Sequence, residues 1–459
     1  MDTTSAPVTA RSDDGRSFVV ADASGSAFVA GSLVIVTADE RRQLGLVEER
    51  SETSPVRLRG RLIGELAADG IDTRASHAFE SGALDPVDEA TVEQLHATTG
   101  AELEVGVNLT PPGGPARLLP KRFNRHTFWC GQSGSGKTYA LGVVLEQLVA
   151  HTALPIVIFD PNSDFVRLGE LNADAKGPTA EALAGRDIRV LRPHGRPGSE
   201  LRARFLDLPL PSKAAILRLD PVADRAEYNA LVHLQDVLRQ GELEDLLPML
   251  RNRATEPGHP LAQRIENLAV LEWEVWAGEA TAVTDVVGER PDATVLDLGG
   301  FSTPEQQLVV ALALLDDLWE RREERRPVLL VIDEAHNLAS PNLDSALAVA
   351  VRERLLQIAA EGRKFGLWML LSTQRPSKVH PGIISQCDNL ALMKMSSPVD
   401  LGELGTYFGY APAALIERSP WFRQGEALFA GGFVPTPSLV KMNPRLTPEG
   451  GTDVGVPLR

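Results

Sequence analysis

The residues with the clearest chemistry form a glycine-rich turn at 131–138. The turn reads Gly131, Gln132, Ser133, Gly134, Ser135, Gly136, Lys137 and Thr138. Glycines let the backbone curl until successive N–H groups face one concavity, which suits a phosphate group. Lys137 would reach the β- and γ-phosphates of a nucleotide, and the Thr138 hydroxyl would bind Mg²⁺. An apolar run precedes the turn and a helical pattern follows it, so we expect ATP and Mg²⁺ to bind here.

An acidic pair ends the apolar run at residues 327–333. Asp333 and Glu334 would lie at the carboxyl end of a parallel strand, where α/β proteins bind their ligands. A lone pair of this kind is usually a solvated strand end, but the phosphate loop upstream favours a catalytic interpretation. Asp333 would hold Mg²⁺, and Glu334 would orient the attacking water. His336 has two interpretations, as a structural residue or as one coupled to the nucleotide.

Polar side chains also end two other apolar runs. Ser372, Thr373 and Gln374 follow the run at 367–371, and an amide at Gln374 could contact both a γ-phosphate and water. The simpler interpretation of this segment is a turn before a proline. Asp160, followed by Asp164, ends the run at 155–160. That carboxylate could assist the nucleotide site, or the Asp-Pro-Asn-Ser sequence could be only a turn.

Two cations, Arg363 and Lys364, end a predicted helix just before the strand that leads to Gln374. Cations at such a place can simply counter the negative end of the helix dipole. The alternative is an arginine finger, donated to the site of a neighbouring subunit to neutralise charge in the transition state. The sequence does not decide which of the two residues would act in this way.

The elements that must position these residues indicate an α/β protein. Nearly continuous apolar runs alternate with helical patterns from about residue 121, as in parallel strands covered on both faces. Residues 17–66 read as short alternating strands, typical of a small barrel or sandwich. We expect the following organisation: a disordered lead at 1–16, an N-terminal all-β domain at 17–110, core segments at 120–210 and 291–430, a helical insertion at 211–290, and a C-terminal tail at 431–459.

Composition excludes several classes of protein. The chain has 459 residues, of which 43% are hydrophobic and 24% charged, as in a soluble globular protein of two or three domains. The net charge of −16 excludes a basic protein that coats nucleic acid, but it leaves room for a narrow basic channel. The start of the chain lacks the apolar core of a signal peptide, and no apolar run approaches the roughly 18 residues of a membrane span. Cys130 and Cys387 lie too far apart in sequence for a metal or redox motif, so we expect reduced, buried thiols in a cytoplasmic protein.

Taken together, these motifs resemble the HerA-like ATPases of the HerA/FtsK superfamily. The matching segments are RHTFWCGQSGSGKT (the Walker A loop), FDPNSDF, VLLVIDEAHNL (Walker B), EGRKFGLWMLLSTQRPSKV and VKMNPRLTPEGG, a latch-like segment. The resemblance covers roughly residues 120–210 and 290–450. Asn162 and Ser163 depart from the family's His-Gly. The N-terminal strands resemble the family's HAS barrel in position and texture.

The resemblance implies a RecA/FtsK-like P-loop core with a mostly parallel sheet, in a homohexameric ring that hydrolyses ATP and moves DNA. It implies that Lys137 and Thr138 bind nucleotide, Asp333 binds Mg²⁺, Glu334 is the catalytic carboxylate, Gln374 is the sensor and Arg363 acts in trans. Such proteins often work with a nuclease in DNA end processing or antiviral defence. The alternative is an ATPase scaffold that assembles and gates an effector nuclease without helicase activity.

Overall fold

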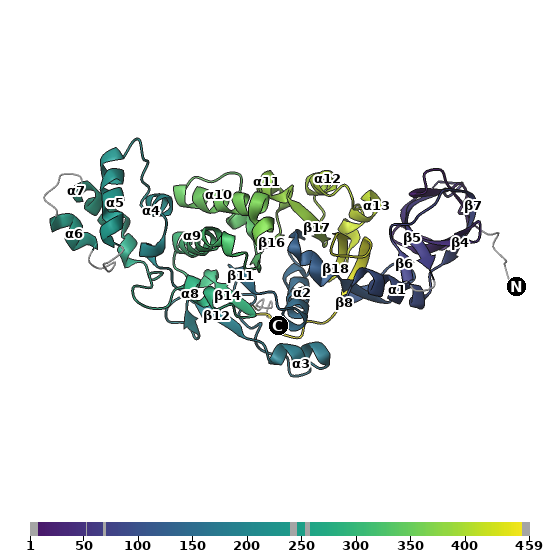
Figure 1. Cartoon of the computed structure of the whole chain (residues 1–459), viewed down its shortest axis with the longest axis horizontal. Coiled ribbons are helices and arrows are strands. Elements are labelled where there is room, and N and C mark those ends of the chain that lie inside the picture. Colours follow the sequence, from purple (N-terminus) through teal and green to yellow (C-terminus); the bar gives the residue numbers. More distant parts are fainter. Residues whose placement is uncertain (1–7, 52, 68–69, 239–245, 253–257, 452–459) are drawn as a thin grey trace, which may run out of the picture. The chain divides into compact units, whose positions relative to one another are not determined.

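The computed structural model describes residues 8–51, 53–67, 70–238, 246–252 and 258–451 (Figure 1). The chain divides into two compact units. The first unit comprises residues 1–152, 374–377 and 387–446, and the second comprises 153–373, 378–386 and 447–459. Neither unit is one continuous stretch of chain, so the division differs from the linear order of domains that the sequence predicts.

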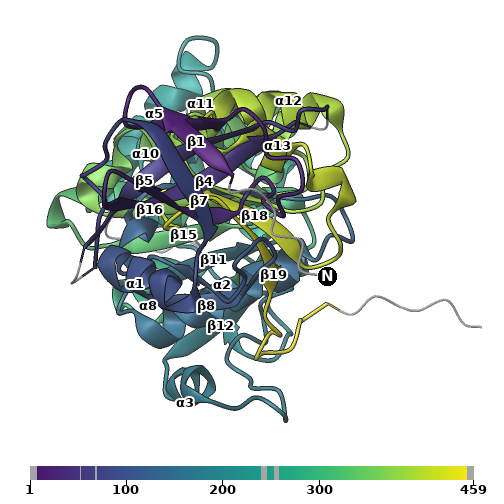
Figure 2. The same cartoon turned by 90° about the vertical axis from the view of Figure 1, so that its right-hand side faces the viewer.

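The first unit begins with a closed β-barrel (Figure 2). Its strands are β1 (Thr9–Ser12), β2 (Ser17–Val20), β3 (Leu33–Ala38), β4 (Arg41–Arg50), β5 (Leu58–Ala67) and β7 (Phe79–Pro86), with β6 (Gly70–Asp72) added at the edge of β5. The six strands run in the order β2-β1-β7-β3-β4-β5, and pairing of β2 with β5 closes the ring. Phe18 fills the interior beside Gly60, where a Cβ would lie 2.3 Å from the Phe18 ring. The expectation of a small N-terminal barrel is confirmed.

Two boundaries of this domain differ from the prediction. Residues 1–7 of the predicted disordered lead lie outside the described residues, but Thr9–Ser12 is strand β1, paired with β2 and β7. Its alternating exposed and buried residues are too short a pattern to detect in the sequence. The barrel also ends at Pro86 rather than 110. Helix α1 (Glu89–Thr99) follows, and β8 (Leu103–Asn108) pairs with β19 in another sheet.

The rest of the first unit contains six strands that pair side by side. They are β10 (His126–Cys130), β17 (Cys387–Leu392), β18 (Glu426–Gly431), β19 (Ser438–Met442), β8 and β9 (Pro115–Leu118), in that order. Among these six strands only β10 and β17 are parallel, and the other four pairings are antiparallel. The residues predicted as a tail at 431–459 include β19, which lacks a continuous apolar run because Ser438 and Lys441 are polar. Helices α12 (Pro398–Tyr407) and α13 (Ala413–Ile416) belong to the same unit.

The second unit has the parallel sheet that the apolar runs predict. Its order is β13 (Ser199–Glu200), β12 (Ile188–Arg192), β14 (Ala293–Asp297), β11 (Ile156–Asp160), β15 (Val328–Ile332) and β16 (Leu367–Thr373). Every residue of β11, β14 and β15 is buried. Helices α9 (Pro304–Glu320) and α10 (Ala346–Glu361) pack against each other, and the shorter α3 (Pro178–Ala184) and α11 (Pro381–Ile384) complete the core.

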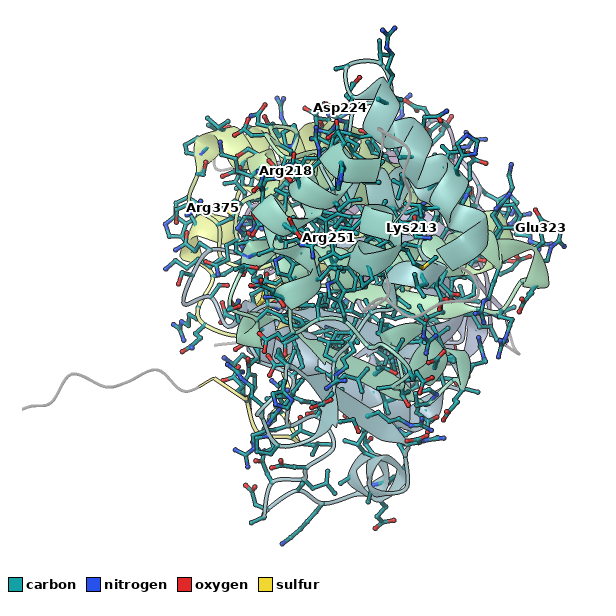
Figure 3. The ribbon with its side chains drawn as sticks, turned by 90° about the vertical axis from the view of Figure 1, so that its left-hand side faces the viewer. Lys213, Arg218, Asp224, Arg251, Glu323 and Arg375 are labelled. Atoms are coloured by element: carbon teal, nitrogen blue, oxygen red, sulfur yellow. The ribbon has the colours of Figure 1, made fainter. Side chains whose placement is uncertain are left out.

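The described part of the predicted insertion at 211–290 is helical. It holds α4 (Leu210–Ile216), α5 (Arg225–Leu238), α6 (Leu246–Asn252), α7 (Gly258–Leu268) and α8 (Val283–Gly288). Figure 3 shows this segment from its outer side, with Lys213, Arg218, Asp224 and Arg251 labelled. A buried carboxylate fastens it to the core, because Asp316 of α9 accepts hydrogen bonds from Ser212 of α4 (2.5 Å) and Arg354 of α10 (2.8 Å).

Helix α2 (Lys137–His151) of the first unit is held by the C-terminal segment of the chain. Arg445 forms a fully buried ion pair with Glu146 of α2, at 3.6 Å, and its backbone N–H donates to the Tyr139 hydroxyl. A Cβ at Gly142 would lie 2.5 Å from Nε of Arg445. The lack of a side chain at Gly142 therefore allows the Arg445 guanidinium to pack against the backbone of α2.

We predict that Gly142→Ala lowers the free energy of unfolding by about 1–3 kcal/mol, because the added methyl group overfills a buried contact. Gly402→Ala is the matched control, since Gly402 is an exposed glycine of α12 at which an added Cβ would meet no neighbouring atom within 4 Å. The control should be neutral or stabilising by up to about 1 kcal/mol. Urea unfolding of both variants measures the difference, and equal midpoints would contradict the packing argument.

Candidate functional site

The phosphate loop lies between β10 and α2 in the first unit, as predicted. Gly134 and Gly136 have φ angles of 75° and 84°, in the left-handed region that favours glycine. A Cβ at Gly131 would lie 2.8 Å from both the Met393 side chain and Ser135 Oγ. Backbone geometry and close packing thus require glycine at all three positions. Because α2 starts at Lys137, the positive end of a 15-residue helix faces the loop.

The chemistry of the loop fits a nucleotide phosphate. Lys137 is 5% exposed and sits in the first turn of α2, followed by Thr138. Ser135 Oγ is buried and makes no hydrogen bond to any residue in the described part of the chain. A hydroxyl donor, an ammonium group and a helix N-terminus therefore gather at one turn, which is the arrangement that binds phosphate.

A second loop, at residues 418–426, supports the phosphate loop and was missed by the sequence analysis. The Gly425 N–H donates to the Ser135 carbonyl at 2.9 Å, and Gly425 N lies 3.2 Å from where a Cβ of Gly136 would be. Lys441 of β19 in turn donates to the Gln424 carbonyl at 2.6 Å. No motif in the sequence marks this support, because it depends on backbone contacts between segments about 290 residues apart.

Three predicted acidic residues lie together in the second unit. Asp160 ends β11, and Asp333 and Glu334 directly follow β15, its parallel neighbour. All three are buried, and the backbone N–H of Asp333 donates to the Phe159 carbonyl at 3.1 Å. Asp160 accepts hydrogen bonds from the N–H groups of Asp164 and Phe165 at 3.0 and 2.8 Å. Burial, reinforced by the nearby negative charges of Asp164 and Asp333, raises the pKa of Asp160 to about 7.

The tip of β16 contacts the turn that follows β15. Ser372 Oγ donates to Asp333 Oδ1 at 2.7 Å. Glu334 has a φ of 45°, an unusual conformation for a residue other than glycine, and one that is typical of functional sites. His336 Nδ1 lies 3.1 Å from Glu334 Oε2 and 3.1 Å from Thr373 Oγ1. His336 therefore contacts the predicted catalytic carboxylate directly.

A further buried carboxylate, Asp297, was not singled out from the sequence. It ends β14, and it is the register partner of Asp160. Its carboxylate accepts hydrogen bonds from Ser163 Oγ at 2.6 Å and from Arg196 at 3.1 Å, and Arg192 lies 3.6 Å away. The available signal was the same one that marked Asp160 and Asp333, an aspartate at the end of an apolar run. Asp297 ties the turn that follows β11 to the turn that follows β12.

The structure does not bring Arg363 and Lys364 to this cluster. Both are exposed and lie in a 3-10 turn (Gly362–Phe365) between α10 and the start of β16. The acidic cluster lies at the other end of that seven-residue strand, roughly 20 Å away at about 3.3 Å per residue. Within one chain, therefore, Arg363 is at the opposite edge of the sheet from Glu334. Gln374 follows β16 directly in the chain and is counted with the first unit.

Each unit offers an oxygen donor of the kind that Mg²⁺ uses. Mg²⁺ is usually held by one or two protein oxygens together with phosphate oxygens and water. Asp333 in the second unit offers a buried carboxylate, and Thr138 in the first unit offers a hydroxyl. Among the described residues, no three His, Cys, Asp or Glu side chains gather as a metal-binding group of their own.

Comparison with known proteins agrees with the motifs. Residues 103–318 match the family model described as the central domain of the helicase HerA. The chain is 22% identical over 381 residues to the DNA double-strand break repair helicase HerA of Saccharolobus solfataricus, covering 78% of this chain and 72% of that protein. It is 30% identical over 131 residues to a probable protein of the same name from Methanocaldococcus jannaschii, covering 28% and 25%.

The chain spans about a quarter of the length of the first curated relatives that it matches. Among solved structures, VirB4 of Thermoanaerobacter pseudethanolicus has a similar fold, with a TM-score of 0.53 at 17% identity over 75% of this chain and 97% of that one. In the described part of the chain, no helix combines the length and apolar character needed to cross a membrane.

Proposed function

We propose that the chain is an ATP-hydrolysing motor of the HerA type that translocates on or unwinds DNA, because residues 103–318 match the HerA central-domain model. The observation that carries this proposal is the buried pair Asp333 and Glu334 at the carboxyl edge of a parallel sheet, where Ser372 donates a hydrogen bond to Asp333 and His336 lies 3.1 Å from Glu334. A phosphate-binding turn without such carboxylates could bind nucleotide but would lack the groups that hold a metal and orient water.

Each proposed role follows from the chemistry of the residue. Residues 131–136 cradle the phosphates with backbone N–H groups, Lys137 neutralises their charge, and Thr138 and Asp333 supply oxygen ligands to Mg²⁺. The metal, when bound, neutralises charge that develops on the phosphates. Glu334 accepts a hydrogen bond from the attacking water, and Gln374 senses the γ-phosphate. Asp160, with its raised pKa, lies beside Asp333 and assists the nucleotide site.

The position of Arg363 favours an oligomer. A guanidinium at the opposite edge of the sheet from Glu334 cannot serve its own chain, but it could reach the site of a neighbouring copy. Head-to-tail contacts of this kind close into rings. We therefore include a homohexamer in the proposal, with Arg363 as the residue that acts in trans and Lys364 as the alternative.

DNA is the proposed polymer because the relatives are named as DNA repair helicases. The proposal also includes a partner nuclease, a role in DNA end processing or antiviral defence, and a cytoplasmic location. The alternative is an ATPase scaffold that gates an effector nuclease. The charge of the N-terminal region favours a protein partner for the barrel, because residues 1–120 contain 19 acidic and 10 basic side chains.

For the ATPase itself, we predict that Lys137→Ala abolishes nucleotide binding, whereas Glu334→Gln binds ATP but hydrolyses it at least about a hundredfold more slowly. Equilibrium binding of a fluorescent ATP analogue and steady-state phosphate release measure the two properties separately. Turnover by Glu334→Gln at the wild-type rate would remove Glu334 from the catalytic role.

For the motor, we predict that duplex DNA raises ATP turnover several-fold, and that this stimulation falls steeply between about 50 and 200 mM salt because phosphate contacts release counterions. Heparin is the control for a general response to polyanions. If DNA leaves turnover unchanged at low salt while the protein still hydrolyses ATP, the scaffold alternative holds instead.

A further inference from the structure

Trp421 is unusually exposed for an aromatic residue, and it lies in the loop at 418–426 that contacts the phosphate loop. It is 78% exposed, whereas Phe128 and Trp129, in β10 of the same unit, are fully buried. Tryptophan is highly buried on average, because its indole ring carries a large apolar surface. A single exposed apolar residue needs no explanation by itself. The case for a ligand therefore depends on where Trp421 lies and on which residues flank it.

The direction of the strands explains why this loop lies beside the phosphate loop. Strands β10 and β17 are parallel, and β18 is antiparallel to β17. The start of β18 therefore lies at the same edge of these paired strands as the carboxyl end of β10, where the phosphate loop begins. The hydrogen bond from the Gly425 N–H to the Ser135 carbonyl, at 2.9 Å, joins the two loops at this edge. Both loops belong to the first unit.

The distance from Trp421 to the phosphate loop suits a bound nucleotide. Trp421 ends a 3-10 turn (Ser419–Trp421) and lies four residues before Gly425. Four residues of chain span at most about 14 Å, which is comparable with the extended length of a nucleoside triphosphate. Gly425 N in turn lies 3.2 Å from where a Cβ of Gly136 would be. An indole at this place can meet the base of a nucleotide whose phosphates occupy the loop.

Two arginines flank the tryptophan and leave their guanidinium groups available. Arg418 and Arg423 are exposed, and within the described residues neither guanidinium makes a hydrogen bond or an ion pair. Glu426 accepts a hydrogen bond from the backbone N–H of Arg423, at 2.8 Å, and not from its side chain. The loop therefore offers positive charge and a flat apolar surface together, and this combination binds nucleotides through their bases.

The turn that carries Trp421 is fixed on both sides of the residue. Ser419 is fully buried, and its Oγ donates to the Met393 carbonyl at 2.7 Å. Phe422, the next residue after Trp421, is buried as well. The indole is therefore presented to solvent by an ordered turn. Binding to such a preorganised ring costs less conformational entropy than binding to a mobile loop.

We propose that the loop at 418–426 is the base-binding part of the nucleotide site, with Trp421 stacked on the nucleobase and with Arg418 and Arg423 attracting the anionic ligand. The phosphate loop recognises phosphate groups, so it cannot by itself distinguish a nucleotide from an inorganic polyphosphate. Stacking on Trp421 supplies this distinction, because every nucleobase has a π-face and inorganic polyphosphate has none. The inference rests on the function proposed above, since it adds a subsite to the nucleotide site.

The first test compares a ligand that has a base with one that has none. ADP and inorganic tripolyphosphate are titrated calorimetrically into the wild type, Trp421→Ala, Trp421→Phe and Val399→Ala. We expect Trp421→Ala to weaken ADP binding about fivefold or more, the effect of losing one stacked base, and to leave tripolyphosphate binding within about twofold. Trp421→Phe keeps a π-face and should retain most of the ADP affinity. Val399→Ala is the matched control, since Val399 is 67% exposed in α12 of the same unit, and it should change neither affinity.

Two results would overturn the proposal. One is equal ADP affinity in the wild type and in Trp421→Ala. The other is an equal loss of affinity for ADP and for tripolyphosphate, which would indicate damage to the phosphate loop. If Trp421→Ala keeps its ADP affinity but changes its oligomeric state or its binding of a single-stranded oligonucleotide, the tryptophan serves another copy or a nucleic acid instead. If the wild type binds neither ligand, the proposed nucleotide site itself fails.

Indole fluorescence tests the contact directly and requires no hydrolysis. A base that stacks on an indole quenches its emission, so ADP should reduce the fluorescence of the wild type and tripolyphosphate should not. Trp421→Phe should lose this quenching although it still binds ADP. Quenching of equal size in the wild type and in Trp421→Phe, or no quenching of the wild type at saturating ADP, would contradict the stacking.

Discussion

The burial of several carboxylates at one edge of an apolar parallel sheet is the constraint on which the second unit depends. Asp160, Asp297, Asp333 and Glu334 are all nearly inaccessible to solvent. A buried charge is costly unless it is paired or hydrogen-bonded. The surrounding segments supply such partners for the three aspartates: the turn after β11 for Asp160, Ser163 and Arg196 for Asp297, and Ser372 for Asp333. His336 Nδ1 lies 3.1 Å from Glu334 Oε2. The hydrogen bonds to these carboxylates consequently fix the turns that follow the strands.

The first unit depends on a different constraint, which is backbone conformation and not the burial of charge. The phosphate loop requires glycine at positions where a side chain would collide or the φ angle is positive. The helix that follows is itself fastened by the buried pair of Glu146 and Arg445, for which Gly142 makes room. Arg445 therefore holds the helix that follows the phosphate-binding turn, and Gly425 contacts the turn itself.

The sequence predicted those features that depend on the residue pattern of one short segment. The phosphate loop, most of the apolar parallel strands and the acids Asp160, Asp333 and Glu334 were predicted from local patterns, because burial and strand ends leave a mark within about ten residues. The strands β1 and β19 were missed because polar residues interrupt both, so neither forms a continuous apolar run. The switch of β8 from the barrel to a second sheet was missed because alternation does not say which strand is the neighbour. The contacts of His336 and Gly425 depend on tertiary packing, which no single segment records.

Mn²⁺ electron paramagnetic resonance tests the central proposal, that Asp333 binds the metal that accompanies a bound nucleotide. With ATPγS bound, Mn²⁺ should show hyperfine coupling to phosphorus. Asp333→Asn should weaken Mn²⁺ affinity by about tenfold or more while leaving nucleotide affinity nearly unchanged. Phosphorus coupling and Mn²⁺ affinity that are both unaffected by Asp333→Asn would contradict the account.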